Sequence, residues 1–241
     1  MILLFTDFGV NDIYAGQVRA VLAQRCPEVP VVDLFHDAPA FNVRASARLL
    51  ASLVERVPDD SIIMAVVDPG VGSDRRAIMV KTGRHTFVGP DNGLLALAAR
   101  PASRTLVATL PVPVTASPTF HGRDLFAPVV AQLAVGQQPA LAGSLDQLVG
   151  DDWDDDLAEI IYVDHYGNLV TGLKAGAVTA VHRLFVNDVA ISQSRIFDDV
   201  SIGELMWYEN SLGLVEIARN QGSAAAHLGA KIGTRVQTEN Q

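Results

Sequence analysis

The chain has 241 residues, of which 49% are hydrophobic and 19% are charged, so it can bury a sizeable core and is not mainly disordered. Its length permits one large domain or two unequal ones. The formal net charge of -9 opposes a phosphate backbone and argues against nucleic acid as a partner. No apolar run reaches the roughly 18 residues of a membrane span. The single cysteine, Cys26, excludes an internal disulfide and a cysteine-rich metal site.

The first residues, MILLFTDFG, reach Asp7 without a basic region or a cleavage site. They read as a buried strand rather than a signal peptide. We therefore expect a soluble, cytoplasmic protein that has no membrane partner.

Up to about residue 135, short apolar runs alternate with segments of helical periodicity. Several of the apolar runs are continuous, which is typical of strands covered on both faces. The pattern predicts an α/β N-terminal domain over residues 1–150, with a parallel-rich sheet. The expected strands are 2–5, 29–35, 61–68, 77–82 and 85–89. The first expected helix follows a cap at Asn11 or Asp12 and carries its apolar face on Ile13, Tyr14, Val18, Val21 and Leu22. A second helix is expected over 43–57, before Pro58. Two more are expected over 93–100 and over 123–135, the latter interrupted by Pro128.

An acidic run, DDWDDD, occupies residues 151–156 and holds five of the 27 acidic residues. Such a run repels itself, which favours an exposed, extended linker. It lacks the glycine and the terminal glutamate of a calcium loop, so a metal site here is disfavoured.

Beyond the linker, strand-like segments separated by turn chemistry dominate, and only 173–180 and 223–228 look helical. This rhythm predicts a smaller C-terminal β-barrel domain over residues 157–241. Its expected strands are 159–164, 183–191, 194–197, 204–209, 214–218 and 234–238.

Polar residues follow the ends of several predicted strands in the N-terminal half. Asp7 comes directly after the first strand, Asp68 ends a buried strand before a Gly-rich loop, and His121 lies on a loop that leads into a helix. Ligands of open α/β sheets bind beyond the carboxyl ends of the strands, so Asp7 and Asp68 would lie there. Each residue also has a structural interpretation, because both aspartates could cap turns and a lone histidine is more often structural.

Other common site signatures are absent from the sequence. The GVG segment, residues 70–72, lacks the lysine and the serine or threonine of a phosphate loop. The six histidines show no zinc-ligand spacing, and no serine occupies a nucleophile elbow. The residues alone thus predict an α/β and β protein with an acidic, Gly-lined cleft.

Six motifs in a fixed order narrow this interpretation. They are TDFG (6–9), VVDPGVG (66–72) followed by Arg75, PDNG (90–93), TFHGRD (119–124), DHYGN (164–168) and NSLGLVEIARNQGSAA (210–225). Together they resemble the family of S-adenosyl-L-methionine hydrolases, also called adenosyl hydroxide transferases, which is related to the fluorinases and chlorinases. The resemblance extends from residue 2 to about residue 236.

The resemblance implies an α/β N-terminal domain, a β-barrel C-terminal domain and a homotrimer. It also implies that the nucleoside is bound between the N-terminal domain of one subunit and the C-terminal domain of the next. For the nucleoside itself, it assigns Asp7 to the ribose hydroxyls and Asn168 to the adenine. Arg219 would serve the adenine through its backbone.

The same resemblance assigns the amino-acid half of the substrate. Asp164 matches the acid that binds the methionine amino group, and Ser211 of the NS-x-G motif points to the carboxylate. Glu216 lies on the adjoining strand as a further substrate-binding residue.

The branch of the family that uses hydroxide carries an Asp-Arg-His set, and Asp68, Arg75 and His121 are its counterparts. The fluorinase lacks this aspartate, has an aromatic residue at the position of His121, and carries an extra loop that KTGRHTFVGPDNG (81–93) does not contain. The resemblance therefore implies hydrolysis of S-adenosyl-L-methionine to adenosine and L-methionine. Family members clear the R epimer at sulfur, which implies that preference here.

The chemistry of the substrate fits this set. A sulfonium is its own leaving group, so the demand falls on a water aligned with C5′, and no metal or organic cofactor is required. His121, with a pKa near neutral, would be a suitable base to activate that water, while Asp68 and Arg75 hold the water in position. The alternative makes Asp68 the base and His121 a hydrogen-bonding wall, and the neighbouring Arg76 could replace Arg75. A chlorinase-like halide transferase and a non-catalytic binder of adenosine or S-adenosylmethionine are the alternative functions.

Overall fold

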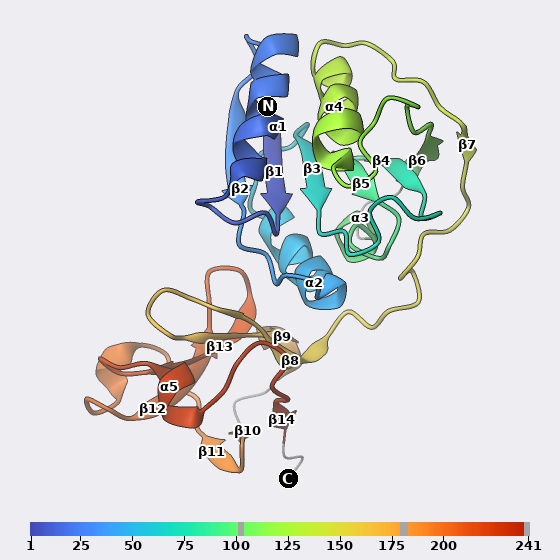
Figure 1. Ribbon diagram of the computed structural model, residues 1–241. Coiled ribbons are helices and arrows are strands. Elements are labelled where there is room, and N and C mark those ends of the chain that lie inside the picture. Colours follow the sequence, from blue (N-terminus) through green and yellow to red (C-terminus); the bar gives the residue numbers. More distant parts are fainter. Residues whose placement is uncertain (101–103, 179–182, 239–241) are drawn as a thin grey trace. The chain divides into compact units, whose positions relative to one another are not determined.

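The computed structural model describes residues 1–100, 104–178 and 183–238 (Figure 1). The chain divides into two compact units, Met1–Trp153 and Asp154–Gln241. Within the described ranges, no helix is both long enough and apolar enough to cross a membrane.

The N-terminal unit is built on a seven-stranded sheet with the order β2-β1-β3-β5-β4-β6-β7. Its strands are β1 (Ile2–Thr6), β2 (Val31–Phe35), β3 (Ile62–Val66), β4 (Ala77–Thr82), β5 (Thr86–Pro90), β6 (Arg104–Leu110) and β7 (Gly143–Ser144). Its helices are α1 (Ile13–Arg25), α2 (Val43–Val54), α3 (Ala96–Ala99), a π-helical turn η1 (Gly122–Phe126) and α4 (Ala127–Ala134).

The sheet is mixed rather than parallel-rich. β2, β1, β3 and β5 run parallel to one another, as the sequence predicts. β4 is antiparallel to β5, and β6 and β7 continue antiparallel. The turn between β4 and β5 spans only residues 83–85, which is too short for the crossover that a parallel pair requires.

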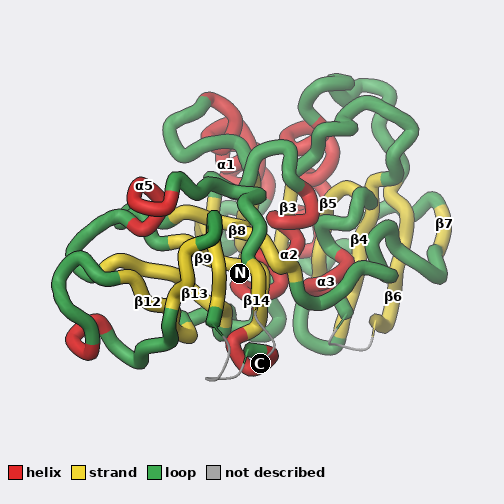
Figure 2. The backbone as a smooth tube through the Cα atoms, turned by 90° about the horizontal axis from the view of Figure 1, so that it is seen from below, coloured by secondary structure: helices red, strands yellow, loops and turns green. Residues whose placement is uncertain are grey.

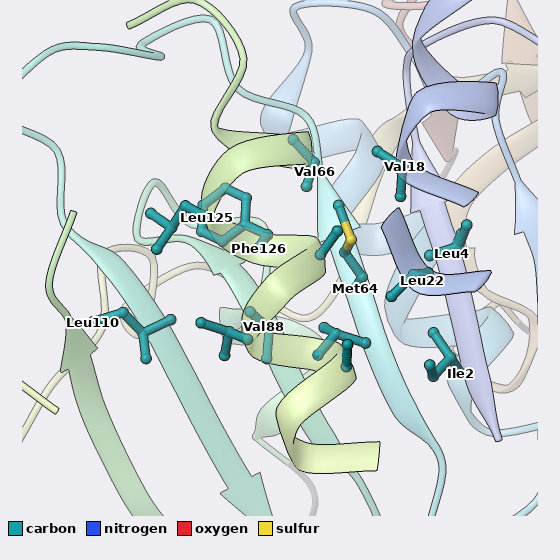
Figure 3. Close-up of a cluster of buried hydrophobic side chains, with 14 of the residues drawn as sticks. Ile2, Leu4, Val18, Leu22, Met64, Val66, Val88, Leu110, Leu125 and Phe126 are labelled. Carbon is teal, nitrogen blue, oxygen red and sulfur yellow. The ribbon is translucent and has the colours of Figure 1, made fainter. Parts of the chain in front are cut away.

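One hydrophobic cluster joins the sheet to two helices. Ile2 and Leu4 of β1 and Met64 of β3 meet residues of α1 and α4, which lie side by side (Figures 1 and 3). Leu3 and Phe5, which alternate with Ile2 and Leu4, are also buried. The strand is therefore covered on both faces, which explains its continuous apolar run.

The helix starts follow their capping residues, but one predicted helix face is only partly buried. Asp12 caps α1 by accepting from the Ile13 N–H at 2.6 Å, and Asn42 caps α2. Val18 and Leu22 are buried, whereas Ile13 and Tyr14 are exposed. The first turn of α1 is thus only partly covered by the core, and Tyr14 borders the pocket described below.

Two further helix predictions differ in their extent. The helix expected over 93–100 is the short α3, because residues 93–95 still belong to the turn that begins with PDNG. Pro128 does not interrupt the segment 123–135, since it lies in the first turn of α4, where proline is tolerated. β6 and β7 were not expected from the sequence.

The C-terminal unit consists of two antiparallel sheets, with orders β12-β13-β9-β8 (Figure 2) and β11-β10-β14. Its strands are β8 (Leu157–Val163), β9 (Leu169–Lys174), β10 (Leu184–Val186), β11 (Val189–Ile191), β12 (Leu205–Glu209), β13 (Leu214–Arg219) and β14 (Gln237–Thr238). Its helical turns are η2 (Ala175–Ala177), η3 (Phe197–Asp199) and α5 (Ala224–Leu228).

The β-rich prediction for this unit is confirmed, with local differences. The segment 183–191 is a hairpin whose two turn residues, Asn187 and Asp188, both have positive φ. The strand expected at 194–197 is absent, because Ile196–Asp199 forms a turn of 3₁₀ helix and its cap. Of the helix expected over 173–180, only η2 forms, and residues 179 and 180 lie outside the described ranges.

The acidic segment is held on both sides rather than freely extended. Asp151 accepts two hydrogen bonds from Arg104, at 2.6 and 2.8 Å, within the N-terminal unit. In the C-terminal unit, Asp155 pairs with the Lys174 ammonium at 3.1 Å. Trp153 fits against Gly93, whose positive φ and lack of a Cβ leave room for the indole ring.

A buried histidine, His85, at the amino end of β5 should make the stability of the fold depend on pH. His85 precedes β5 and is 5% exposed, and burial, with the charge of Arg84, lowers its pKa from 6.5. Above that value the ring is neutral in both states. Below pH 6.5, His85 becomes protonated in the unfolded chain but stays neutral in the folded chain, so the free energy of unfolding falls.

We therefore expect His85→Gln to flatten the decline in unfolding free energy from about pH 7 to about pH 5. Urea unfolding at a series of pH values measures this decline. His121, whose pKa is also lowered, leaves part of the slope in place. An unchanged slope in the variant would show that His85 is not the group responsible.

Candidate active site

Asp7 and Asp68 line one pocket of about 340 Å³ in the N-terminal unit. Asp7 follows β1 and Asp68 follows β3, and the two strands are parallel neighbours. Their carboxyl ends therefore meet at the same edge of the sheet, as the sequence predicts. The pocket is lined by Asp7, Phe8, Asp12, Tyr14, Ala40, Phe41, Val66, Asp68, Pro69, Val71, Thr119, Phe120, His121 and Gly122.

Burial is the largest influence on the Asp7 carboxyl and raises its pKa. The backbone N–H groups of Asp7 and Phe41 oppose this shift, while the negative charge of Asp68 adds to it. Phe41 has a φ of 62°, in the left-handed region, so its segment is held in an uncommon conformation beside the carboxylate. Two carboxylates thus share this pocket, and no lysine or arginine is among the described residues that line it.

Asp68, Arg75 and His121 form one hydrogen-bonded cluster. Arg75 Nε donates to Asp68 Oδ2 at 2.9 Å, and Nη2 donates to the same oxygen at 2.5 Å. Nη2 also lies 2.8 Å from His121 Nδ1. The side chains of Asp68 and Arg75 are only 4% and 9% exposed, so water screens this pair weakly.

The structure distinguishes the two adjacent arginines. Arg75 lies behind Asp68 and His121, and its guanidinium carbon is 5.4 Å from the centre of the Phe126 ring. Arg76 instead pairs with Asp91 of the PDNG turn. Arg75 is therefore the arginine of the cluster.

The cluster fixes the tautomer of His121. A guanidinium has no acceptor, so His121 Nδ1 must accept from Arg75 and the hydrogen of the neutral ring lies on Nε2. Burial and the charge of Arg75 lower the pKa of His121, which keeps the ring neutral near pH 7. In this state His121 offers the pocket a donor rather than a base.

A π-helical turn places His121 at the pocket. The ring precedes η1, and the N–H of Ala127 bonds to the carbonyl of Gly122 to close the wide turn. Such turns are rare and frequent at functional sites. A Cβ at Gly122 would lie 3.0 Å from the Phe8 ring and 3.2 Å from that of Phe120, so this close approach favours glycine.

A second pocket, of about 620 Å³, lies in the C-terminal unit. It contains four of the residues that the resemblance assigns to substrate, Asp164, Asn168, Glu216 and Arg219. Its full lining is Asp164, Tyr166, Asn168, Phe197, Tyr208, Glu216, Arg219, Gln221, Gly222 and Ser223.

The DHYGN turn is organised by its own aspartate. Asp164 Oδ1 accepts from the Asn168 N–H at 2.8 Å, and Oδ2 accepts from Asn168 Nδ2 at 2.9 Å. Gly167 has a φ of +84°, and a Cβ there would lie 2.1 Å from Ser223 Oγ. The Asn168 amide is thereby oriented with Oδ1 left to accept a hydrogen bond from a ligand.

Glu216 is the centre of a second network in this pocket. It pairs across the strands with Tyr208, whose hydroxyl donates to Oε1, and Asn210 Nδ2 donates to Oε2 at 2.9 Å. Arg219 Nε donates to the Gly203 carbonyl at 2.8 Å. Ser211 is exposed in the turn between β12 and β13 and is not among the residues that line the pocket.

Sequence reasoning missed the aromatic side chains of both pockets. Phe8, Tyr14 and Phe120 contact one another in the first pocket, with ring centroids 5.2–5.9 Å apart. Tyr208 and Phe197 are in contact in the second. Their signal is the position next to the polar motifs, since Phe8 follows Asp7 and Phe120 precedes His121.

The chain is similar to known proteins along nearly its whole length. An S-adenosyl-L-methionine hydrolase of the R epimer from Thermus thermophilus is 37% identical over 98% of each chain. Its counterpart from Salinispora tropica is 38% identical over 96% of this chain and 95% of that one. The crystal structure of a conserved protein from Thermotoga maritima matches with a TM-score of 0.88 and 30% identity over 100% of both chains. A fluorinase from Actinopolyspora mzabensis is more distant, at 24% identity over 98% of this chain and 96% of that one.

Two family models match the two units in order. The SAM hydroxide adenosyltransferase N-terminal domain matches residues 2–143, which include Asp7, Asp68, Arg75 and His121. The C-terminal domain of the same family matches residues 158–237, which include the second pocket. The chain belongs to the SAM hydroxide adenosyltransferase family.

Proposed function

We propose that this protein hydrolyses S-adenosyl-L-methionine, with preference for the R epimer at sulfur, to adenosine and L-methionine. The observation that carries the proposal is the hydrogen-bonded Asp68–Arg75–His121 cluster, of which Asp68 and His121 line a pocket together with Asp7. Near-full-length similarity to hydrolases of the R epimer supports the substrate and its stereochemistry. Incubation with both epimers, followed by chiral chromatography of the residual substrate, tests the preference.

The substrate's polar groups find complementary partners in the two pockets. The Asp7 carboxylate would accept from both ribose hydroxyls, and Asn168 Oδ1 would accept from the adenine amino group. Asp164 supplies negative charge for the methionine ammonium, and Ser211, exposed in its turn, would meet the carboxylate. Glu216 and Arg219 complete the second pocket.

We expect Asp7→Ala to weaken adenosine binding at least tenfold. A charge-assisted hydrogen bond contributes about 1.5–3 kcal/mol, and the variant loses two such bonds to the ribose. Calorimetry with adenosine measures the change, and the unfolding midpoint serves as a control for the fold. Unchanged affinity in the variant would overturn the ribose role of Asp7.

The chemical step is a displacement at C5′. The water oxygen forms a bond to C5′, while the electrons of the C5′–S bond move onto sulfur and release neutral methionine thioether. The positive charge of the sulfonium is lost in this step, so the leaving group needs no acid, metal or organic cofactor. Alignment of the water behind C5′ contributes several kcal/mol to such a reaction.

The tautomer of His121 supports Asp68 as the group that receives the proton. His121 Nε2–H would donate to the water oxygen, the water would donate to the Asp68 carboxylate, and one lone pair would remain for C5′. Arg75 holds both partners from behind through Nη2. His121 as the base would require Nδ1 to give up its bond to Arg75 or Nε2 to lose its hydrogen.

We also propose a homotrimer in which the N-terminal pocket of one subunit and the C-terminal pocket of the next enclose one substrate. The division of the assigned groups between two separate pockets supports this arrangement. Closure of the C-terminal unit into a barrel is a related proposal. Isolated bridges from Glu159 to Arg235 and from Gln193 to Trp207 support it, because they join the two sheets at both edges.

Product analysis separates the proposed function from its alternatives. Adenosine and methionine indicate a hydrolase, a 5′-halo-adenosine that forms only with halide indicates a halogenase, and unchanged ligand indicates a binding protein. The retained Asp68–Arg75–His121 set favours the first outcome. A cytoplasmic location remains a prediction of the sequence.

A further inference from the structure

A buried threonine, Thr6, directly precedes Asp7 in the chain. Thr6 is the last residue of β1 and is fully buried. Its Oγ1 accepts from the Phe8 N–H at 3.2 Å and lies 2.7 Å from His36 Nδ1. The residues before and after Asp7 are therefore tied to a single oxygen atom.

His36 holds this loop at a second point. It directly follows β2, the parallel neighbour of β1, and is 5% exposed. Its carbonyl accepts from the Gly9 N–H at 2.7 Å. One residue thus fixes the segment 6–9 through its ring on one side of Asp7 and through its backbone on the other.

The charges around the ring set the direction of the Thr6 bond. His36 Nε2 is 3.0 Å from Asp33 Oδ1, a contact that is close but not aligned as a hydrogen bond. Arg19 pairs with the other oxygen of Asp33 at 2.7 Å. A carboxylate at Nε2 favours a proton there, so Nδ1 accepts from the Thr6 hydroxyl, whose oxygen remains free to accept from Phe8.

We propose that His36 is a positioning residue that fixes the Asp7 carboxylate for its ligand, acting through the Thr6 hydroxyl. Neither His36 nor Thr6 lines the pocket, so neither would touch the ligand. The inference rests on the proposed ribose role of Asp7. It adds a support that reaches from the Arg19–Asp33 pair on the surface to the carboxylate in the site.

Paired substitutions separate the two ring nitrogens. His36→Gln places its amide near the Nε2 position and loses the acceptor for Thr6, whereas His36→Asn offers an oxygen near Nδ1. Thr6→Val loses the hydroxyl and Thr6→Ser keeps it. We expect His36→Gln and Thr6→Val each to weaken adenosine binding about tenfold and to raise KM more than they lower kcat. His36→Asn and Thr6→Ser should stay within about threefold of the wild type.

The double variant Thr6→Val/His36→Gln should bind adenosine about as weakly as each single variant, because both changes remove the same hydrogen bond. Losses that multiply would overturn the action of His36 through Thr6. His85→Gln is the matched control, since His85 is equally buried in the same unit but lies at the amino end of β5, away from the pocket. It should lower the unfolding midpoint without changing adenosine affinity.

Equal losses of affinity in His36→Gln and His85→Gln would assign the effect to general stability and overturn the proposal. The proposal is also overturned if Thr6→Val binds adenosine as tightly as the wild type although Asp7→Ala binds it more weakly. That result would leave the proposed function intact. Wild-type affinity in Asp7→Ala would overturn the ribose role and this inference together. The histidine pair is sufficient for the test if Thr6→Val does not fold.

Discussion

Asp68→Asn is expected to lower kcat at least about a hundredfold, the usual contribution of a general base. The amide cannot take the proton of the attacking water, and its NH₂ group would face the Arg75 guanidinium that now binds both carboxylate oxygens. Adenosine affinity should change much less, because the ribose is assigned to Asp7. Single-turnover kinetics with S-adenosylmethionine, with calorimetry for adenosine, measures the two quantities separately.

Asp151→Asn is the matched control for this variant. Asp151 also accepts two hydrogen bonds from one arginine, Arg104, but it is not among the residues that line the pocket. Turnover in this control should be close to that of the wild type. An Asp68→Asn enzyme with near-normal kcat would remove Asp68 as the proton acceptor and return the role to His121.

The pH profile of His121→Gln separates the two schemes further. Glutamine can place an N–H near the position of Nε2, so a histidine that acts only as a donor should be replaced with a modest loss of rate. If His121 is instead the base, the same substitution should remove most of the enzyme's turnover. If His121 is the base, turnover should fall on the acid side below pH 6.5, because the pKa of His121 is lowered from that value, and this acid limb should disappear in the variant.

The parts of the fold that were predictable are those in which one local pattern decides the structure. β1, β3, β4 and β5 are continuous apolar runs bounded by turn residues, and each forms close to its predicted bounds. β9 was missed because its buried residues include Thr171, whose hydroxyl donates to the Val215 carbonyl, and Gly172, which lies against β8. Only the tertiary partners make that segment a strand.

The candidate site shows the same division between local and tertiary information. The aspartates were predictable because a polar residue at the carboxyl end of a parallel strand has a known place in the sheet. The choice between Arg75 and Arg76 was not, since adjacent residues point to opposite sides and only the positions of Asp68 and Asp91 decide between them. The tautomer of His121 likewise depends on a residue 46 positions away.

The surface exposure of Ser211 and the self-contained bonding of Asp164 also have a common explanation. Asp164 orders its own turn through three hydrogen bonds, which a motif match cannot distinguish from ligand binding. Ser211 lies in a turn that Asn210 holds by accepting from the Leu212 and Leu214 N–H groups. Both residues are placed by local turn chemistry, and their roles toward substrate depend on what would face them in the proposed homotrimer.

Two inactive variants are expected to restore activity when they share one trimer. Asp7→Ala removes the ribose carboxylate of the N-terminal pocket, and Asn168→Ala removes the adenine acceptor of the C-terminal pocket. Each homotrimer alone should be nearly inactive. If the N-terminal pocket of one subunit works with the C-terminal pocket of the next, mixed trimers contain one site in which both pockets are intact.

Random assembly of equal amounts of the two chains should therefore recover roughly a quarter of the wild-type sites, since each site needs one particular chain on each side. Co-expression with two affinity tags, followed by tandem purification, retains only the mixed trimers, in which about a third of the sites have both pockets intact, and a turnover assay measures this recovery. The purified Asp7→Ala and Asn168→Ala homotrimers provide the baseline. A fully active monomer in sedimentation, or mixed trimers with no activity above that baseline, would exclude a site shared between subunits, because in a cyclic trimer every mixed assembly joins the two intact pockets once.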